Sequence, residues 1–392
     1  MGRCARVLIG ALVAVEILWL CLALADKGGQ RGLFNDGGRD LFGDFWMPRI
    51  CLRDGYVPPE DFKNSGWQDG VYQVTAYDRC YPPLAMLPLR PFPATREGAL
   101  SWAAVSAMLF LLSMLIPARR CLPLLAALPL SMPFLFALER ANTVWISAAC
   151  VGLFLSWYES EVRWKRVVAA LALSVAAVYK ISPALLGMLY LNTRRGVAIR
   201  EILLCVGVSV TLFFVPFLFV PDGFGGLPAM LSNAMANGAV YARATDFGLL
   251  PVWRAVRVML AQDCSAPWPG MLAVMRLSQV IGLVCVLMGC VRRDRLLATG
   301  GMLMAAGNMF YYGMLYLLPL AAFWAAGDVP YGGRGRRLEG VLWFVVLCPL
   351  QLIVSGHQAN GVLGATALIA LLVLRLASAR PRQMAAHGGS ER

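Results

Sequence analysis

An aspartate set among aromatic residues is the residue of this sequence best suited to chemistry. Asp44 follows Gly43 and precedes Phe45 and Trp46 in a mainly apolar run near the N-terminus. Apolar surroundings raise the pKa of a carboxyl group, which prepares it to accept a proton as a general base. A structural interpretation is equally open, because aspartate is common at the N-cap of a short surface helix.

Tyr81 lies in a second polar run, just before a pair of prolines. Pro82 and Pro83 stiffen the chain where it approaches the next apolar segment. Tyrosine suits the lipid headgroup layer. Tyr81 therefore either anchors the chain at the membrane surface or contacts a substrate.

Arg140 and Asn142 lie in a short polar turn between two apolar segments. In that turn Glu139 can pair with Arg140, and Asn142 can cap the following helix. The same groups are candidates for binding a substrate.

Lys180 lies at a break between two short apolar segments, since Pro183 follows it closely. A cation held at such a break is suited to bind a phosphate group. The alternative is that the side chain snorkels toward the membrane surface.

Three further candidates lie in the second half of the chain. Tyr311 falls at the expected outer end of a span, and His357, one of two histidines, falls in an expected outer turn. A lone histidine there is more often a solvated turn residue than a base. Arg243 lies in a polar stretch that also holds Asn233, Asn237 and Tyr241.

Membrane helices must position these residues, because the chain is too apolar for a water-soluble fold. Of its 392 residues, 59% are hydrophobic and 15% are charged, and the mean hydropathy is +0.64. A soluble core of this length cannot hide that much apolar surface. The long apolar blocks favour helices over barrel strands. We expect an all-α polytopic protein in which residues 1–392 form one membrane domain with about twelve transmembrane helices.

Several expected spans are shorter than the roughly 20 residues that a perpendicular helix needs. The short ones come in pairs that are either half-deep helices or broken helix pairs, which leaves the count open by about two. For the first block we favour an uncleaved signal anchor over a cleaved signal peptide, because its apolar run is long. The expected spans are residues 6–24, 98–117, 121–138, 142–158, 166–179, 181–192, 200–220, 270–291, 295–311, 312–326, 338–355 and 358–376.

Basic residues predict the orientation, because arginine-rich loops resist translocation. Alternate connections and the C-terminal tail carry 20 of the 35 basic residues, and we assign that face to the cytoplasm. Both termini are then cytoplasmic, with residues 377–392 as a disordered tail. The outer face receives a first loop, residues 25–97, which should fold as short helices on the membrane surface, and a second segment, residues 221–269.

The charge and the cysteines exclude several functions. The net charge of +13 is mainly a topology signal with some attraction to anionic lipid, and no basic-aromatic groove indicates nucleic acid. The eleven cysteines form no CxxC or Cys-His pattern, so we expect no metal and no cofactor. Cys51 and Cys80 fall on the outer side, where a disulfide and two free thiols are both open.

Taken in order, the polar runs resemble glycosyltransferase family 87, polytopic enzymes of the GT-C fold class that use polyprenyl-phosphate sugars. The resemblance extends from about residue 40 to about residue 320 and rests on the order and spacing of four short motifs. They are Asp-Phe at Asp44, Tyr-Pro-Pro at Tyr81, a polar turn at Asn142 and Lys-x-x-Pro at Lys180.

The resemblance implies inverting transfer of a mannose-like sugar or a pentose to a glycan or lipid acceptor at the outer face of the plasma (inner) membrane. Asp44 takes the role of general base, and Lys180, with Arg140 or Arg243, stabilises the leaving phosphate. Some relatives place a second ionisable group in the late outer turns, where His357 is the nearest substitute here. The further expected substrate contacts are Tyr81, Asn142 and Tyr311.

Two other classes of function compete with this one. A transporter or flippase for a lipid-linked sugar also suits twelve spans with broken helix pairs. Such proteins usually have repeated halves and mid-membrane charges, whereas this chain has no visible repeat and gathers its polar residues at one face. A structural subunit of an envelope-assembly complex would leave Asp44 without a task.

Overall fold

The structure, a computed structural model, is mostly helical. It describes residues 6–7, 9–15, 17, 42–57, 66–68, 71–119, 121–241, 248–260, 270–306, 311–327, 333–348 and 357–378. These ranges contain one β-sheet, a two-stranded antiparallel hairpin of β1 (Gly66–Gln68) and β2 (Val71–Gln73). The expectation of an all-α fold is confirmed apart from this hairpin, which lies within residues 25–97, the expected first outer loop.

The described residues between 42 and 95, within the expected first outer loop, otherwise include short helices. They are α2 (Gly43–Asp54), the 3₁₀-helix η2 (Ala76–Asp78), α3 (Pro83–Met86) and η3 (Leu87–Leu89). Pro83 occupies the first position of α3, where its missing N–H costs nothing.

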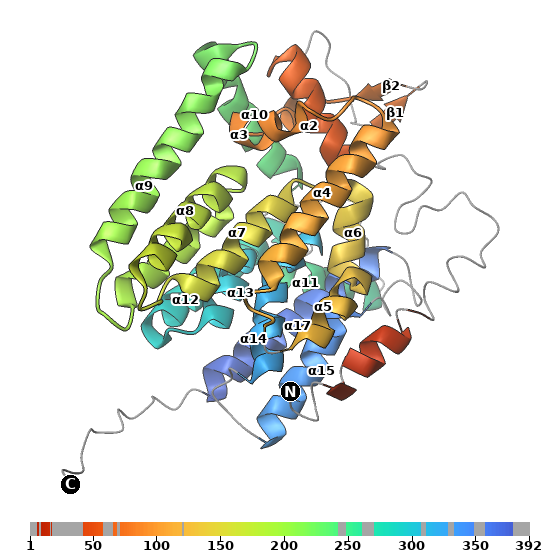
Figure 1. Cartoon of the computed structure of the whole chain (residues 1–392). Coiled ribbons are helices and arrows are strands. Elements are labelled where there is room, and N and C mark those ends of the chain that lie inside the picture. The colour runs from red at the N-terminus through yellow and green to blue at the C-terminus, as the bar shows by residue number, and fades with distance from the viewer. Residues whose placement is uncertain are drawn as a thin grey trace.

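A row of adjacent helices forms one side of the molecule (Figure 1). In it α4 packs on α7, α7 on α8, and α8 on α9, so the row follows the chain order except for the short helices between α4 and α7. The bounds are α4 (Arg96–Met114), α5 (Leu122–Ala127), η4 (Leu128–Leu130), α6 (Met132–Arg140), α7 (Val144–Trp157), α8 (Arg163–Tyr179), η5 (Ser182–Asn192) and α9 (Ile199–Phe214).

Helices from α11 onward form the other side, whereas α10 packs against η2. Helices α12 and α13 form a closely packed antiparallel pair, and α15 packs on α17. The bounds are η6 (Val215–Phe219), η7 (Gly223–Gly226), α10 (Leu227–Tyr241), α11 (Leu249–Met259), α12 (Met271–Arg292), α13 (Arg295–Ala305), η9 (Tyr311–Leu317), α14 (Leu318–Ala326), α15 (Gly333–Leu347) and α17 (His357–Ser378).

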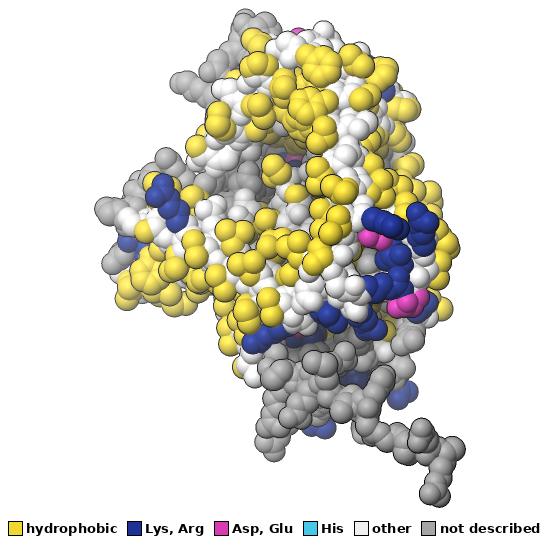
Figure 2. Space-filling model, turned by 90° about the vertical axis from the view of Figure 1, so that its left-hand side faces the viewer, with side chains coloured by type: hydrophobic (Ala, Val, Ile, Leu, Met, Phe, Trp, Pro, Cys, Tyr) yellow, Lys and Arg dark blue, Asp and Glu magenta, His cyan; other side chains and the backbone are white. Residues whose placement is uncertain are grey.

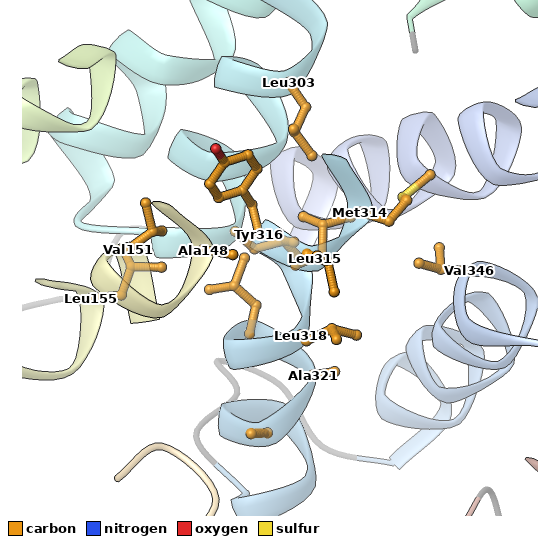
Figure 3. Close-up of a cluster of buried hydrophobic side chains, with 14 of the residues drawn as sticks. Ala148, Val151, Leu155, Leu303, Met314, Leu315, Tyr316, Leu318, Ala321 and Val346 are labelled. Atoms are coloured by element: carbon orange, nitrogen blue, oxygen red, sulfur yellow. The ribbon is translucent and has the colours of Figure 1, made fainter. Parts of the chain in front are cut away.

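The main core lies where the two sides meet. Side chains of α7, including Val151 and Leu155, pack there against η9 and α14 (Figure 3). The hydroxyl of Tyr316, fully buried at the start of this contact, donates a hydrogen bond of 2.8 Å to Ser147. Because this buried hydroxyl is satisfied, the tyrosine adds packing area without the cost of a lost hydrogen bond.

A buried ion network joins three helices at the end where the sequence predicts the cytoplasm. Arg375 of α17 donates to Glu339 of α15 at 2.7 Å and lies 3.5 Å from Asp294. The Asp294 carboxylate in turn accepts the first backbone N–H groups of α13. The carboxylates compensate the buried arginine, so the charge fixes how α13, α15 and α17 meet.

Within the described residues, three helices are long and apolar enough to cross a membrane: residues 96–114, 199–219 and 271–292. This supports association with a membrane, but it is fewer than the twelve expected spans. Three shorter apolar helices cover residues 144–157, 313–326 and 362–377. Proline accounts for part of the shortfall. Pro123, Pro129 and Pro133 divide the expected span 121–138 into α5, η4 and α6, and the segment after Lys180 is 3₁₀-helical throughout.

Candidate functional site

Asp44 carries a buried carboxylate in the first part of the chain. It is the second residue of α2, and only 5% of its surface is exposed. The helix begins after Phe42, which has a left-handed backbone (φ 58°) and donates its N–H to the carbonyl of Glu139. Asp44 is therefore neither an N-cap nor a surface residue, which removes the structural interpretation that the sequence left open.

Three side chains from distant parts of the chain donate hydrogen bonds to the Asp44 carboxylate. Arg140 and Asn142 both reach Oδ2, from Nε at 2.8 Å and from Nδ2 at 2.7 Å. The Tyr81 hydroxyl reaches Oδ1 at a longer 3.2 Å. A carboxylate offers about four acceptor positions, so one position on Oδ1 remains for a hydroxyl group of a substrate.

The turn between α6 and α7 places two of these donors. Ala141 reverses the chain in a left-handed conformation (φ 49°), and its carbonyl accepts a hydrogen bond from the indole of Trp102. Asn142 lies one residue before Thr143, the N-cap of α7, and its Oδ1 accepts the N–H of Val144, the first residue of the helix, at 2.8 Å. Its Nδ2 is thereby aimed at Asp44. The Arg140 side chain pairs with Asp44, an ion pair between two mostly buried groups.

Tyr81 connects the carboxylate to a second cation. The Lys180 ammonium lies 5.7 Å from the centroid of the Tyr81 ring, within the range of a cation–π contact. Lys180 follows the last residue of α8, and the tyrosine precedes α3. The backbone at Tyr81 is held by the hydroxyl of Tyr56, which donates to its carbonyl at 3.0 Å. Four of the predicted site residues therefore meet around Asp44.

Burial dominates the electrostatics of this carboxyl group. Removal from water raises the pKa of Asp44 to about 6, against the nearby charge of Lys180 and the hydrogen bonds from Tyr81 and Asn142, which favour the ionised form. The Arg140 ion pair favours the ionised form as well. At neutral pH the group is a carboxylate, but one with a pKa close enough to neutrality to take up a proton.

Hydrogen bonds join α10, in the second expected outer segment, to residues of the first expected outer loop. On α10, Asn237 donates to the buried Asp78 at 3.1 Å, and Asn233 donates to the carbonyls of Tyr56 and Arg79 at 3.0 and 3.2 Å. Sequence reasoning gave Asp78 no role, because nothing local distinguishes it from other loop aspartates. The two asparagines, noted as polar, join the two segments.

Two cysteines, Cys51 and Cys80, belong to the same part of the chain as Asp44. Cys51 and Cys80 are free in this structure, and burial raises the pKa of both thiols, that of Cys80 to about 12. They are therefore poor nucleophiles. Within the described ranges, no three or more His, Cys, Asp or Glu side chains lie together in a way that could hold a metal ion.

The remaining predicted site residues are not joined to Asp44 by any described contact. Tyr311 begins η9 and His357 begins α17, but neither side chain belongs to the described part of the structure. Arg243 lies outside the described residues. Their expected roles as substrate contacts stay predictions.

We compared this chain with known proteins and found no match. No family model, no curated protein and no solved structure matches this chain.

Proposed function

We propose that this chain is a membrane glycosyltransferase that moves a mannose-like sugar or a pentose from a polyprenyl-phosphate donor to a hydroxyl group of a glycan or lipid. The observation that carries the proposal is the buried Asp44 carboxylate with Arg140, Asn142 and Tyr81 as donors and Lys180 nearby. These groups supply a base and two cations in one place, which is the set that this transfer needs.

In the proposed reaction Asp44 accepts the proton of the acceptor hydroxyl on Oδ1. The acceptor oxygen forms a bond to the anomeric carbon of the sugar while the bond from that carbon to the phosphate oxygen breaks. The electron pair leaves with the polyprenyl phosphate, and the configuration at the carbon is inverted. Asn142 and Arg140 hold Oδ2, so the orientation of the carboxylate is set before the substrate arrives.

The leaving group gains charge during this step, because a phosphodiester becomes a phosphomonoester. Lys180 is the cation proposed to stabilise that charge, since its ammonium lies 5.7 Å from the centroid of the Tyr81 ring and its charge acts on Asp44. Arg140 is engaged by Asp44 at 2.8 Å and serves mainly to keep the base in place. Tyr81 contacts both groups, because its hydroxyl donates to Asp44 and its ring lies beside the Lys180 ammonium.

The proposed setting is the outer face of the plasma (inner) membrane, with both termini in the cytoplasm. The polyprenyl tail stays in lipid while the sugar enters between the two outer segments. Helix α9, which continues through η6 toward these segments, has no buried residue in its sixteen residues and so offers lipid an apolar face. The partners are the lipid-linked donor, the acceptor and membrane lipid.

The proposal is tested with purified protein in lipid vesicles that contain labelled polyprenyl-phosphate sugars. Two quantities are measured for each donor: label joined to an acceptor, and label moved across the bilayer on an intact donor. Transfer to the acceptor with release of polyprenyl phosphate is expected. Movement of intact donor across the bilayer without transfer to the acceptor would contradict the glycosyltransferase proposal and would indicate a transporter or flippase.

A further inference from the structure

A charged cavity lies far from Asp44, at the other end of α8. Its volume is about 450 Å³, and four arginines line it together with two glutamates: Arg166, Arg194, Arg195, Arg200, Glu159 and Glu201. From Arg166 to Lys180, α8 rises about 21 Å, at 1.5 Å per residue. The cavity is thus on the side that the sequence assigns to the cytoplasm, and the Asp44 cluster has no part in it.

Acidic residues pair with three of the four arginines. Arg166 donates to Glu201 at 2.9 Å, and the Arg194 guanidinium lies 3.8 Å from the Glu159 carboxylate. Arg195 donates to Glu161. The cavity lining itself carries four positive and two negative side chains. Lys165, which contacts two tryptophan rings at 5.9 and 5.6 Å, adds another positive charge beside it. The excess positive charge favours an anionic ligand.

Helix α9 begins at the cavity and adds backbone donors. Its N-cap, Ala198, supplies no side-chain acceptor, and in the first turn the Glu201 carboxylate accepts a hydrogen bond from its own backbone N–H. The N–H groups of the first turn and the positive end of the helix dipole face the region that residues 197–201 line. Planar guanidinium groups next to free backbone N–H groups are the usual surroundings of a bound phosphate.

The rim of the cavity is apolar, which identifies the kind of molecule that carries the phosphate. Val197, Ile199 and Leu203 are 56%, 60% and 67% exposed, and Trp164 is 56% exposed. A broad hydrophobic face with Lys and Arg side chains gathered along its margin is visible in Figure 2. Exposed tryptophan beside basic residues is typical of the membrane interface. A small soluble anion would gain nothing from this rim, whereas acyl chains would cover it.

We propose that this cavity binds the phosphate head group of an anionic phospholipid from the predicted cytoplasmic leaflet, with the acyl chains lying along α9. The arginines and the start of α9 contact the phosphate, and the exposed apolar residues of α9 contact the chains. Such a lipid would link the α7–α8 turn to the turn before α9, because both line the cavity. The site is independent of the sugar-transfer proposal and stands or falls separately.

The test measures binding of phosphatidylglycerol to the purified, delipidated full-length protein in an uncharged detergent. Phosphatidylcholine with the same acyl chains is the neutral lipid, and inorganic phosphate is the soluble competitor. The variant Arg194→Gln with Arg195→Gln removes two basic side chains that are 67% and 40% exposed. We expect it to bind phosphatidylglycerol about tenfold more weakly at low salt.

Two further variants separate charge from folding. The double lysine variant, Arg194→Lys with Arg195→Lys, keeps the charge and should retain most of the binding. Arg53→Gln with Arg96→Gln removes two exposed arginines from the outer side and should bind as the wild type does. Equal binding of both lipids, undiminished binding in the glutamine variant, or displacement of the lipid by millimolar phosphate would each overturn the proposal.

Discussion

At the scale of single residues, the Asp44 cluster explains how one carboxylate combines burial with readiness to ionise. Burial alone would keep the acid protonated, and a bare ion pair would make it too weak a base. The donors offset the desolvation in part and leave the pKa of Asp44 at about 6. A proton acceptor with this pKa is ionised at pH 7 and still basic enough to assist a hydroxyl group.

The pH dependence of sugar transfer follows from this value. Protonation of Asp44 removes the base, so we expect kcat/KM to fall about tenfold per pH unit below roughly pH 6. The positive charge of Lys180 lowers the pKa of Asp44. In Lys180→Met the ionised form loses that support, and the midpoint of the acid limb should move to higher pH. The measurement is a pH–rate profile of both proteins.

Lys165→Met is the matched control for this profile, because Lys165 is a half-buried lysine on the other side of the molecule. Its acid limb should coincide with that of the wild type. An acid limb in Lys180→Met that shifts to lower pH, or does not move, would show that Lys180 does not act on the base.

Sequence reasoning found the residues of this cluster but not the cluster itself. Asp44, Tyr81, Arg140, Asn142 and Lys180 were each suggested by their types and neighbours. The contacts with Asp44 join residues that are 37 to 98 positions apart, and Lys180 reaches Tyr81 from further still along the chain, so only tertiary packing decides whether they meet. The sequence offered Asn142 as a helix cap or as a substrate contact, and it did not predict that one side chain both accepts the N–H of Val144 and donates to Asp44.

At the scale of elements, the side chains of α10 act as a clamp: they donate hydrogen bonds that hold residues 56–79 in place. Asn237 satisfies the buried carboxylate of Asp78, so Asn237→Ala leaves that group short of a donor. We expect the free energy that holds α10 on residues 56–79 to fall by about 1–3 kcal/mol. Hydrogen exchange of the outer segments should become faster. Ser232→Ala, an exposed change on the same helix, should leave the exchange unaltered; equally fast exchange in both variants would rule out the clamp.

The pair α12 and α13 depends on glycine at the contact. A Cβ atom added at Gly289 would lie 2.5 Å from the backbone nitrogen of Ala298, which cannot yield as a flexible side chain could. Gly289→Val should therefore force the helices apart and destabilise the protein by about 1–3 kcal/mol. Thermal unfolding in detergent measures the effect.

Gly207→Val on α9 is the control for that substitution. A Cβ atom at Gly207 meets nothing within 4 Å, so this variant should unfold near the temperature of the wild type. If the two variants lose equal stability, the close approach of α12 and α13 does not stabilise the fold.

Element boundaries show where sequence reasoning was incomplete. Apolar blocks located the helices, since hydrophobicity is a local property of the chain. The blocks do not reveal that prolines divide one expected span into α5, η4 and α6, or that β1 and β2 pair in the first outer loop. Those outcomes depend on how neighbouring elements support a broken or extended backbone.

At the scale of the whole molecule, the account requires the Asp44 cluster and the arginine-lined cavity to lie on opposite sides of a membrane. A pair of exposed positions tests this: Arg53, with 74% of its side chain exposed, and Arg194, with 67% exposed. In intact cells a membrane-impermeant maleimide should label Arg53→Cys and not Arg194→Cys. Wild-type protein gives the background from native cysteines. The reverse pattern of labelling would contradict the proposed orientation.

The helical fold was foreseen at this scale, and the number of spans was not. Composition alone excludes a soluble core, which is why the fold class follows from the sequence. Three helices in the described ranges meet the length and hydropathy of a span, and the remaining apolar segments are shorter or broken. Short helices rely on their neighbours to satisfy the backbone at membrane depth, so their number cannot be counted from hydropathy.

The measurement that tests the central claim most directly is sugar transfer by Asp44→Asn beside Asp54→Asn. Both aspartates belong to α2, but Asp44 is buried at the cluster whereas Asp54 is exposed and paired with Arg53. Asparagine keeps the shape of the side chain and removes the base. We predict a loss of about a hundredfold or more in kcat for Asp44→Asn and near wild-type transfer for Asp54→Asn. Equal turnover in wild type and Asp44→Asn would contradict the account.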